Sequence, residues 1–495
     1  MQWFIEGMVK CAGSECSLTW VGACLAGLHE PAWRPRTTRH GRTQQHRSPF
    51  EVIMNHDKVT FQVQLGGTLK GEARVPGDKS VSHRSIMLGS LAEGTTRVSG
   101  FLQAEDCLST MKAFQAMGVV IEGPVDGRVT IHGVGLHGLK APAQALYLGN
   151  SGTSMRLLSG LLAGQSFDAV LTGDESLSRR PMKRVTEPLR SMGAVIDTTE
   201  KGTAPLYIHG GSPLKGIHYE MPVASAQVKS CLLLAGLYAE GQTSVWEPAP
   251  TRDHTERMLA GFGHPVTREG QVVSITPGGK LTACDIDVPS DISSAAFFMV
   301  GASIAEGADV LLRHVGINPT RTGVIDILKL MGADIEIQNP REAGGEPVAD
   351  IRIRSSRLRG IQIPEDLVPL AIDEFPVLFV AAACAEGETR LTGAEELRVK
   401  ESDRIQVMAD GLRLLGVDAT PTPDGMVVRG GPMTGGVVES HGDHRIAMAF
   451  SIAGLRAGGP ITIHDCANVN TSFPTFVELA GRLGLAVASH REATP

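Results

Sequence analysis

The feature that most constrains the fold of this chain is a short pattern that occurs six times in its 495 residues. In each copy an apolar segment rich in leucine and methionine runs into a glycine, and residues that favour strands follow. The glycines are Gly118, Gly193, Gly263, Gly332, Gly416 and Gly484, at successive spacings of 75, 70, 69, 84 and 68 residues. A glycine after a helix is the expected left-handed C′ residue, and β-branched residues after it favour a strand.

This regular spacing indicates an internal repeat, although helix–glycine–strand junctions occur in any α/β protein and the third and sixth copies match loosely. A chain of this length also exceeds what one ordinary core covers. We therefore expect an α/β (α+β) fold with two domains of three units each, in which every unit mixes helices and short strands.

A second pattern lies at the starts of several predicted helices, which open on polar or glycine-rich residues and then become almost wholly apolar. They include residues 76–92, 148–163, 222–237, 289–302, 397–412 and 441–455. Apolar helices of this kind belong to a core, and their N-termini present free N–H groups and the positive end of the helix dipole. If these ends converge on one cleft, that cleft binds a polyanion.

The helical register places charged residues at these helix starts on inward-facing stripes. In the first helix Ser80 and Arg84 share a face with apolar residues. In the fifth, Glu401 shares a face with apolar residues, and Lys400 and Arg404 are i,i+4 neighbours beside it. The ordinary alternative for the fifth segment is a solvated, salt-bridged helix start.

Three further motifs have ordinary explanations. Asp373 precedes another apolar helix, where an aspartate is commonly an N-cap. The glycine-containing turn at 149–156 lacks the Walker spacing, so a nucleotide P-loop is not expected. His441 and His444 flank Asp443, but this spacing without a further acidic or thiol ligand makes a poor metal site, and we expect no bound metal.

Composition excludes several classes of partner and compartment. A net charge of -7 argues against nucleic acid and anionic membranes, and no apolar run reaches the ~18 residues of a membrane span. Eight cysteines without a CxxC pair favour a reducing compartment such as the cytoplasm. Residues 1–56 have neither period nor signal-peptide character, although their arginines and few acids resemble a transit peptide. We expect a disordered extension or an early start codon, with Met54 as the true start.

The polar motifs together resemble those of the 5-enolpyruvylshikimate-3-phosphate synthase family. The matching stretches are GDKSVSHR (77–84), GNSGTSMR (149–156), RRPM (179–182), SAQVKS (225–230), TRDHTE (251–256), DEFP (373–376), RVKESDR (398–404) and DHRIAM (443–448). They run in unbroken order between about residues 58 and 489, and SAQ, TRDHTE and NTSFP resemble the second of the family's two sequence classes.

The resemblance implies the enolpyruvyl transferase fold, an inverted α/β barrel with two domains of three βαβαββ units and the substrates enclosed between them. One domain would comprise residues 58–77 plus 312–490, and the other residues 78–311. The implied activity is transfer of the enolpyruvyl group of phosphoenolpyruvate to the 5-hydroxyl of shikimate 3-phosphate, with release of phosphate. This reaction belongs to the shikimate pathway to chorismate and aromatic amino acids. It needs no metal or organic cofactor, and we expect a cytoplasmic monomer.

The family's functional residues carry over position by position. Shikimate 3-phosphate would be held by Lys79, Ser80, Arg84, Ser225, Ala226, Gln227, Arg252, Asp373 and Lys400. Phosphoenolpyruvate would be held by Lys79, Gly152, Arg180, Gln227, Arg404 and Arg445. The expected catalytic residues are Asp373, which exchanges the hydroxyl proton, and Glu401 with Lys79, which exchange the proton at the methyl carbon.

Three positions separate this chain from parts of the family. Ser176 and Thr471 stand where the first class has an arginine and a lysine, so Arg180 must replace the former and one phosphate contact is expected to be missing. Gly152 stands where some second-class members have alanine, which predicts room for the phosphonate herbicide glyphosate.

Two other function classes remain open. Enolpyruvyl transfer to a UDP-sugar in peptidoglycan synthesis would require a lysine–asparagine pair and a cysteine loop, but Ser80 follows Lys79 here and no cysteine lies in such a loop. A non-catalytic anion-binding repeat protein is disfavoured because both carboxylates accompany a full arginine set. Enzymes of nucleic-acid 3′ ends share part of the repeat, but they would need a basic surface.

Overall fold

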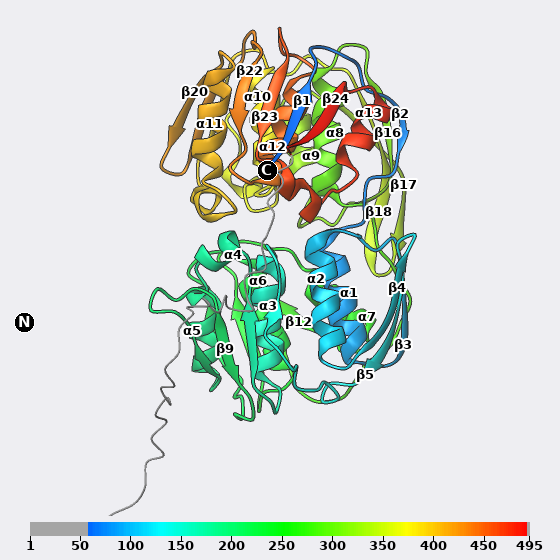
Figure 1. The fold of residues 1–495 in the computed structure, drawn as a ribbon, viewed down its shortest axis with the longest axis vertical. Coiled ribbons are helices and arrows are strands. Elements are labelled where there is room, and N and C mark those ends of the chain that lie inside the picture. Colours follow the sequence, from blue (N-terminus) through cyan, green and yellow to red (C-terminus); the bar gives the residue numbers. More distant parts are fainter. Residues whose placement is uncertain (1–57, 493–495) are drawn as a thin grey trace, which may run out of the picture. The chain divides into compact units, whose positions relative to one another are not determined.

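The computed structural model describes residues 58–492 (Figure 1). The expected extension of residues 1–56, with the alternative start at Met54, lies outside the described residues. No helix in the described part of the chain is long and apolar enough to cross a membrane.

The strands between Lys58 and Glu492 form six small sheets, one for each repeat unit. One unit is continuous in sequence and contains β6 (Leu146–Tyr147), α3 (Gly152–Ala163), β7 (Ala169–Thr172), α5 (Lys183–Ser191), β8 (Val195–Asp197) and β9 (Leu206–His209), with the short α4 (Glu175–Arg179) before α5. Its β6 and β7 are parallel, and β9 pairs antiparallel with both β7 and β8. The order is βαβαββ, as the resemblance implied.

The next unit repeats this order and this pairing. It contains β10 (His218–Glu220), α6 (Ala226–Gly236), β11 (Thr243–Trp246), α7 (His254–Gly261), β12 (Thr267–Glu269) and β13 (Val272–Ile275).

Three other units borrow strands from distant parts of the chain. In the unit of α1 (Lys79–Leu91), β3 (Ala92–Ser99), α2 (Glu105–Ala116), β4 (Val120–Val125) and β5 (Arg128–Val134), the parallel strand comes from β14 (Leu281–Thr282) and β15 (Ile286–Asp287). Figure 1 shows α1 and α2 beside β3, β4 and β5.

The first two strands of the described chain complete two late units. Strand β2 (Lys70–Ala73) is the parallel partner of β16 in the unit of α8 (Ile292–Ile304), β16 (Asp309–Gly316), α9 (Gly323–Leu330), β17 (Asp334–Ala343) and β18 (Glu346–Arg354). Strand β1 (Lys58–Val63) lies between β23 and β24 in the unit of β22 (Gly436–Glu439), α12 (His444–Ala453), β23 (Ile461–His464), α13 (Phe476–Leu483) and β24 (Val487–Glu492).

The remaining unit has three strands. Its elements are α10 (Phe375–Ala383), β19 (Glu388–Leu391), α11 (Arg404–Leu414), β20 (Asp418–Thr422) and β21 (Gly425–Arg429). An isolated parallel bridge between Gln362 and Arg390 stands in place of its first strand.

All six repeat glycines occupy the predicted position. Each follows the second helix of its unit and precedes a strand, and each has a positive φ, between +83° and +115°. Only glycine adopts this conformation without a steric penalty, which explains why the same residue ends all six helices. The six-unit prediction is confirmed.

The buried apolar side chains fall into two core clusters. Core cluster A contains residues from Val59–Val75 and from Ile292–Leu485, whereas core cluster B contains residues from Val81–Val288. The expected boundary at residue 311 would put α8 with cluster B, but every residue of α8 is buried and its apolar residues belong to cluster A. We propose that the domains exchange the chain at residues 75–81 and 288–292.

The polar residues at the helix starts are N-caps. Asp78, Ser151, Ser225, Asp291, Asp403 and Asp443 each accept a backbone N–H two or three residues further along α1, α3, α6, α8, α11 and α12. Helix α1 is buried on every side from Val81 onward, so it is more buried than the single inward-facing stripe predicted from the sequence. These apolar helices form in the core because a capped N-terminus leaves fewer backbone N–H groups unpaired.

Candidate active site

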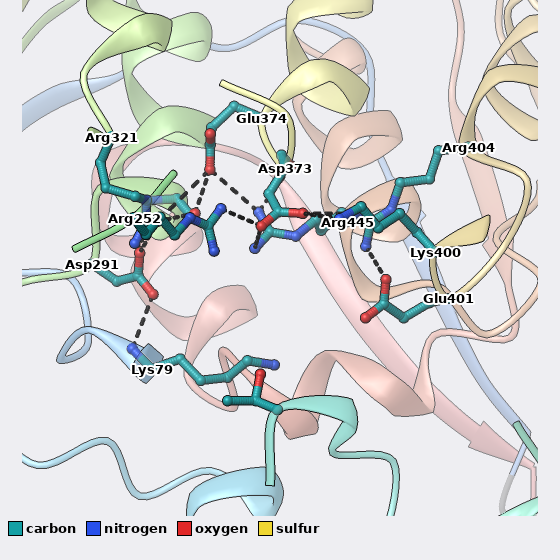
Figure 2. A network of polar contacts seen from close by, with 12 residues as sticks. Lys79, Arg252, Asp291, Arg321, Asp373, Glu374, Lys400, Glu401, Arg404 and Arg445 are labelled. Carbon is teal, nitrogen blue, oxygen red and sulfur yellow. Dashed lines mark hydrogen bonds and ion pairs between the residues drawn. The ribbon is translucent and has the colours of Figure 1, made fainter. Parts of the chain in front are cut away.

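Asp373 is the centre of a cluster of cations drawn from both core clusters (Figure 2). Its carboxylate pairs with Arg252, with Arg404 at 3.3 Å, with Lys400 at 3.7 Å and with Arg445 at 4.0 Å. Burial would raise the pKa of Asp373, but these four cations outweigh it and hold the pKa well below its usual value. Asp373 is therefore a carboxylate at neutral pH.

The ordinary N-cap role of Asp373 is wrong. Helix α10 begins at Phe375, its N-cap position is Glu374, and no side chain caps it. The carboxylate of Asp373 instead faces the cations, and its backbone carbonyl accepts a hydrogen bond from Arg445 Nη1 at 3.0 Å.

Glu401 lies beside the same cluster but not on a helix. Helix α11 begins at Arg404 after the Asp403 cap, so the expected helical stripe through Glu401 is wrong. Its carboxylate accepts from Arg404 Nη2 at 2.6 Å and from Arg180 Nη1 at 3.5 Å. Burial would raise the pKa of Glu401, but Arg404 and Arg180 outweigh it and hold the pKa well below its usual value.

Arg404 connects these two carboxylates to a third. Its side chain is 1% exposed, and its Nε donates to Asp443 Oδ2 at 2.8 Å. The solvated alternative for residues 398–404 is therefore wrong at Arg404, although Arg398 forms a partly exposed pair with Asp403 at 2.6 Å. A buried guanidinium needs such partners, because an unpaired buried charge is costly.

Lys79 is paired with a carboxylate that the sequence did not single out. Its Nζ contacts Asp106 Oδ2 at 2.7 Å, and its backbone N–H donates to Asp291 Oδ2 at 3.2 Å. Burial would lower the pKa of Lys79, but Asp106 and Glu401 outweigh it and raise the pKa, so the amine is an ammonium at neutral pH. Only its position, in the first turn of the next helix, could have drawn attention to Asp106.

Arg84 is bound by neutral oxygens only. Its Nε donates to Thr255 at 2.7 Å, Nη2 to Ser230 at 2.9 Å, and Nη1 to the Ser80 carbonyl at 3.0 Å. It makes no ion pair within the described part of the chain, and burial lowers its pKa to about 10. A buried cation without a counterion is well suited to bind an anionic ligand.

Arg156 has the same character and was not among the expected site residues. It donates to Gln227 Oε1 at 2.5 Å and, among residues 58–492, has no carboxylate partner. Burial, together with nearby Arg184 and Arg180, lowers its pKa to about 10. The signal was present, because Arg156 is the last residue of the matching stretch at 149–156 and lies one turn after Gly152.

Gly152 starts α3 against two guanidinium groups. A Cβ atom at this position would lie 3.0 Å from Arg156 Nη1 and 3.1 Å from Arg180 Nη1. Arg180 also donates to Asn150 and, at 3.4 Å, to the Ser176 hydroxyl that replaces the first-class arginine.

The other expected residues lie at neighbouring helix starts. Ser225 caps α6 and Ala226 is its first residue, while the Nε2 of Gln227 donates to Thr153 at 3.0 Å. Ser80 is half-buried in the first turn of α1.

Thr471 does not replace the family's lysine. Its side chain is buried, and its hydroxyl donates to the Asn468 carbonyl at 2.7 Å, so it belongs to its own turn.

A small cavity adjoins the cluster. It has a volume of about 190 Å³ and is lined by Ser176, Arg179, Arg180, Pro181, Val399, Lys400 and Glu401. Its lining comes from the α4 segment and from the segment before α11, so residues far apart in sequence line one cavity. Among the described residues, no group of three or more His, Cys, Asp and Glu side chains could hold a metal ion.

The chain is similar to known proteins over most of its length. The family model for EPSP synthase (3-phosphoshikimate 1-carboxyvinyltransferase) matches residues 63–479. A 3-phosphoshikimate 1-carboxyvinyltransferase of Methylococcus capsulatus is 76% identical over 433 residues, which are 87% of this chain and 99% of that protein. One from Alkalilimnicola ehrlichii is 72% identical over 430 residues, 87% of this chain and 96% of that protein.

Two solved structures extend the comparison to the fold. An EPSP synthase from Acinetobacter baumannii has a TM-score of 0.79 and 66% identity, and the match covers 87% of this chain and 100% of that one. The enolpyruvyl transferase NikO from Streptomyces tendae has a TM-score of 0.70, with coverages of 88% and 100%. At 16% identity it shows a shared fold only.

Proposed function

We infer that this chain, as a member of the EPSP synthase (3-phosphoshikimate 1-carboxyvinyltransferase) family, transfers the enolpyruvyl group of phosphoenolpyruvate to the 5-hydroxyl of shikimate 3-phosphate and releases phosphate. The observation that carries this function is the cluster in which Asp373 and Glu401 accompany Arg180, Arg404 and Arg445. Two carboxylates among fixed cations suit two anionic substrates that must exchange protons.

The proposed binding site of shikimate 3-phosphate is based on Arg84, a cation without a carboxylate partner. Arg84, together with Ser80 and the start of α6, forms a phosphate site, because Arg84 is buried without a carboxylate partner. Ser225, Ala226 and Gln227 line the ring, and Lys79 and Arg252 join them. Asp373 and Lys400 bond the ring hydroxyls.

Phosphoenolpyruvate binds to the arginines that pair with Glu401 and Asp373 in the free protein. Arg180, Arg404 and Arg445 hold its carboxylate and phosphate, with Gly152, Gln227 and Lys79 beside them. The ligand replaces protein carboxylates as the partner of these cations, so the buried guanidinium groups keep anionic partners when it binds.

The protonation states in the free protein suggest how the carboxylates divide the reaction. The ionised Asp373 accepts the proton of the 5-hydroxyl while the hydroxyl oxygen of shikimate 3-phosphate adds to C2 of phosphoenolpyruvate. C3 receives a proton from Glu401 or from the Lys79 ammonium. The same group takes the C3 proton back as the C–O bond to phosphate breaks.

Glu401 is ionised before substrates bind, so it cannot donate a proton in that state. A bound phosphate among Arg404 and Arg180 would weaken their hold on Glu401 and raise its pKa toward the range of a working acid. Lys79 is already protonated in the free protein.

The reaction belongs to the shikimate pathway, which leads to chorismate and the aromatic amino acids. The net charge of -7 supports small-molecule substrates rather than nucleic acid, and the absence of CxxC pairs supports the cytoplasm as the compartment. We expect the protein to act as a monomer.

A phosphate-release assay tests the function. The purified protein should release phosphate from phosphoenolpyruvate when shikimate 3-phosphate is present, and not when UDP-N-acetylglucosamine replaces it. Phosphate release with the UDP-sugar would instead favour the peptidoglycan enzyme. If no phosphate is released with either acceptor, both assignments are contradicted.

A further inference from the structure

The two segments where the chain passes between its core clusters are bonded to each other. They are residues 75–81 and 288–292. Two backbone hydrogen bonds, of 2.7 and 2.9 Å, join them, and the donors are the N–H groups of Asp78 and Asp291. Because the chain passes between the two core clusters through these two segments, any motion of one cluster against the other must be accommodated there.

A single buried arginine, Arg321, binds the side chains of both aspartates. Its Nη1 contacts Asp78 Oδ2 at 3.1 Å, and its Nη2 contacts Asp291 Oδ1 at 3.3 Å. Nη2 also donates to Ser293 Oγ at 2.7 Å and faces Glu374 Oε1 at 3.9 Å. Arg321 follows β16 and is only 3% exposed, so the solvent screens none of these contacts substantially.

The charges around Arg321 are balanced by other elements. Asp78 and Asp291 cap α1 and α8, where the positive end of the helix dipole favours a carboxylate. Glu374 also faces Arg445 Nη1 at 3.7 Å. Burial would lower the pKa of Arg321, but the three carboxylates outweigh it and raise the pKa, so the guanidinium stays charged.

Each carboxylate that binds Arg321 is also attached to the proposed active site. Asp78 precedes Lys79, and the Oδ2 atom of Asp291 accepts the Lys79 N–H at 3.2 Å. Glu374 follows Asp373 in the turn before α10. Figure 2 shows this network as a continuous path from Lys79 through Asp291 and Arg321 to Glu374.

We propose that Arg321 is a positioning residue for the reaction, because its guanidinium ties the Lys79 backbone to the Asp373–Glu374 turn across both chain crossings. This role rests on the proposed function. Lys79 follows the crossing into core cluster B, whereas Asp373 and Arg445 lie in the part of the chain whose apolar residues form core cluster A. Their relative placement therefore depends on the crossings, and Arg321 binds both of them.

The geometry needs an arginine. Its planar fork presents several donors to oxygens in different directions, whereas a lysine is a point charge at the end of a flexible stem. In Arg321→Lys the charge remains, but the simultaneous contacts to Asp78, Asp291 and Ser293 are lost. The variant therefore separates orientation from charge.

Steady-state kinetics of Arg321→Lys tests the proposal. We expect kcat to fall by about 10- to 100-fold, the loss typical of a small misplacement of reacting groups. The KM values for both substrates should stay within about threefold of wild type, because the groups that bind each substrate are still present. The matched control is Arg313→Lys, since Arg313 also pairs with two carboxylates, Glu72 and Asp350, but at 38% exposure and away from the site.

A milder variant covers the case in which Arg321→Lys does not fold. Ser293→Ala removes one bond to Arg321 and the hydrogen bond to Glu374, and we expect a smaller fall in kcat at unchanged KM. Its thermal midpoint should stay within about 4 °C of wild type.

Three results would overturn the proposal. The first is that every variant that folds has the wild-type kcat per folded molecule. The second is that activity falls only in proportion to the loss of folded protein. The third is that kcat/KM falls only because KM rises. Failure of the proposed function is distinguishable, since the wild-type protein itself would then release no phosphate.

Discussion

At the scale of single residues, the buried arginines divide by their partners. Arg404 and Arg321 each face several carboxylates, whereas Arg84 and Arg156 donate only to neutral oxygens. Burying a guanidinium without a counterion costs free energy, and a bound anion removes that cost. The second pair therefore marks the positions at which the free protein lacks an anion. This reasoning adds Arg156 to the residues that the family resemblance implied.

Substitution of Asp373 should abolish most of the activity. Asp373→Ala removes the proposed base and leaves Arg252, Lys400 and Arg445 without their shared partner, so we expect kcat to fall by at least ~100-fold. The phosphate-release assay measures this, with Asp366→Ala, an exposed aspartate earlier in the same segment, as control. A near-normal rate would remove Asp373 from the mechanism.

Gly152 should determine the response to glyphosate. The wild-type enzyme should be inhibited by millimolar glyphosate. In Gly152→Ala the new Cβ would lie about 3 Å from two guanidinium nitrogens, which must shift by a few tenths of an ångström. We expect inhibition to weaken by about tenfold, equal to about 1.4 kcal/mol, and the KM for phosphoenolpyruvate to rise less. Inhibition curves for both proteins, with Gly431→Ala as an open-site control, measure the effect; an unchanged curve would contradict it.

At the scale of elements, the repeat unit is held by local conformation. The six second helices end in glycines at positive φ, so each chain reversal depends on a backbone state that other residues reach only with strain. Five of the six first helices, all except α10, begin with a side-chain cap. The caps therefore fix where those helices begin, and the turn glycines fix where the second helices end.

Replacement of one turn glycine should destabilise the fold without a steric clash. Gly332 has φ +96°, and the nearest atom to a new Cβ would be the Arg357 carbonyl oxygen at 3.5 Å. Gly332→Ala should therefore lower the free energy of unfolding by about 1–2 kcal/mol through backbone strain alone.

Gly261→Ala is the matched control for this effect. Gly261 is the last residue of α7, without a positive φ, and a Cβ there meets nothing within 4 Å. Alanine favours a helix at such a position, so stability should stay the same or rise by up to about 1 kcal/mol. Denaturant unfolding of both variants measures the difference, and equal effects would rule out the left-handed turn as the cause.

At the scale of the whole molecule, the two core clusters meet at charged groups. Lys79, Arg180 and Arg252 lie in the part of the chain whose apolar residues form core cluster B, and Asp373 and the segment before α11 lie in the part that forms core cluster A. These contacts are ion pairs rather than apolar packing, so their strength depends on protonation.

Acid should weaken this interface in a defined pH range. The pKa values of Asp373, Glu401 and Asp443 are lowered in the folded protein, because the arginines outweigh burial. A carboxyl with a lowered folded pKa contributes stability above its unfolded pKa, which is about 4. That contribution is lost as the pH falls through the folded pKa, so the free energy of unfolding should decline steeply below about pH 4.

Asp443→Asn should flatten that decline. The amide still caps α12, but it removes one titrating partner of Arg404, and at pH 7 we expect a loss of at most about 3 kcal/mol because Glu401 and Asp373 remain. The control is Asp403→Asn, the cap of α11, whose partly exposed pair with Arg398 should contribute less than about 1 kcal/mol. Urea unfolding at a series of pH values measures both; identical pH profiles for all three proteins would contradict this account.

The repeat, the turn glycines, the polar helix starts and the set of residues that share the family's motifs can be predicted from the amino-acid sequence alone. These are properties of short segments, since φ preferences, caps and helical period act within a few residues. The comparisons with relatives confirm the family and fold that those motifs implied.

Which charged residues meet depends on the folded structure. The structure pairs Asp106 with Lys79, and it shows that Asp373 is not the N-cap of α10. It also places Glu401 before the start of α11 and the apolar residues of α8 in core cluster A. It also brought Arg321 to both crossings, although residues 78 and 321 are far apart in the chain. Partner choice among buried charges depends on distances set by packing over hundreds of residues, and a local pattern contains no information about those distances.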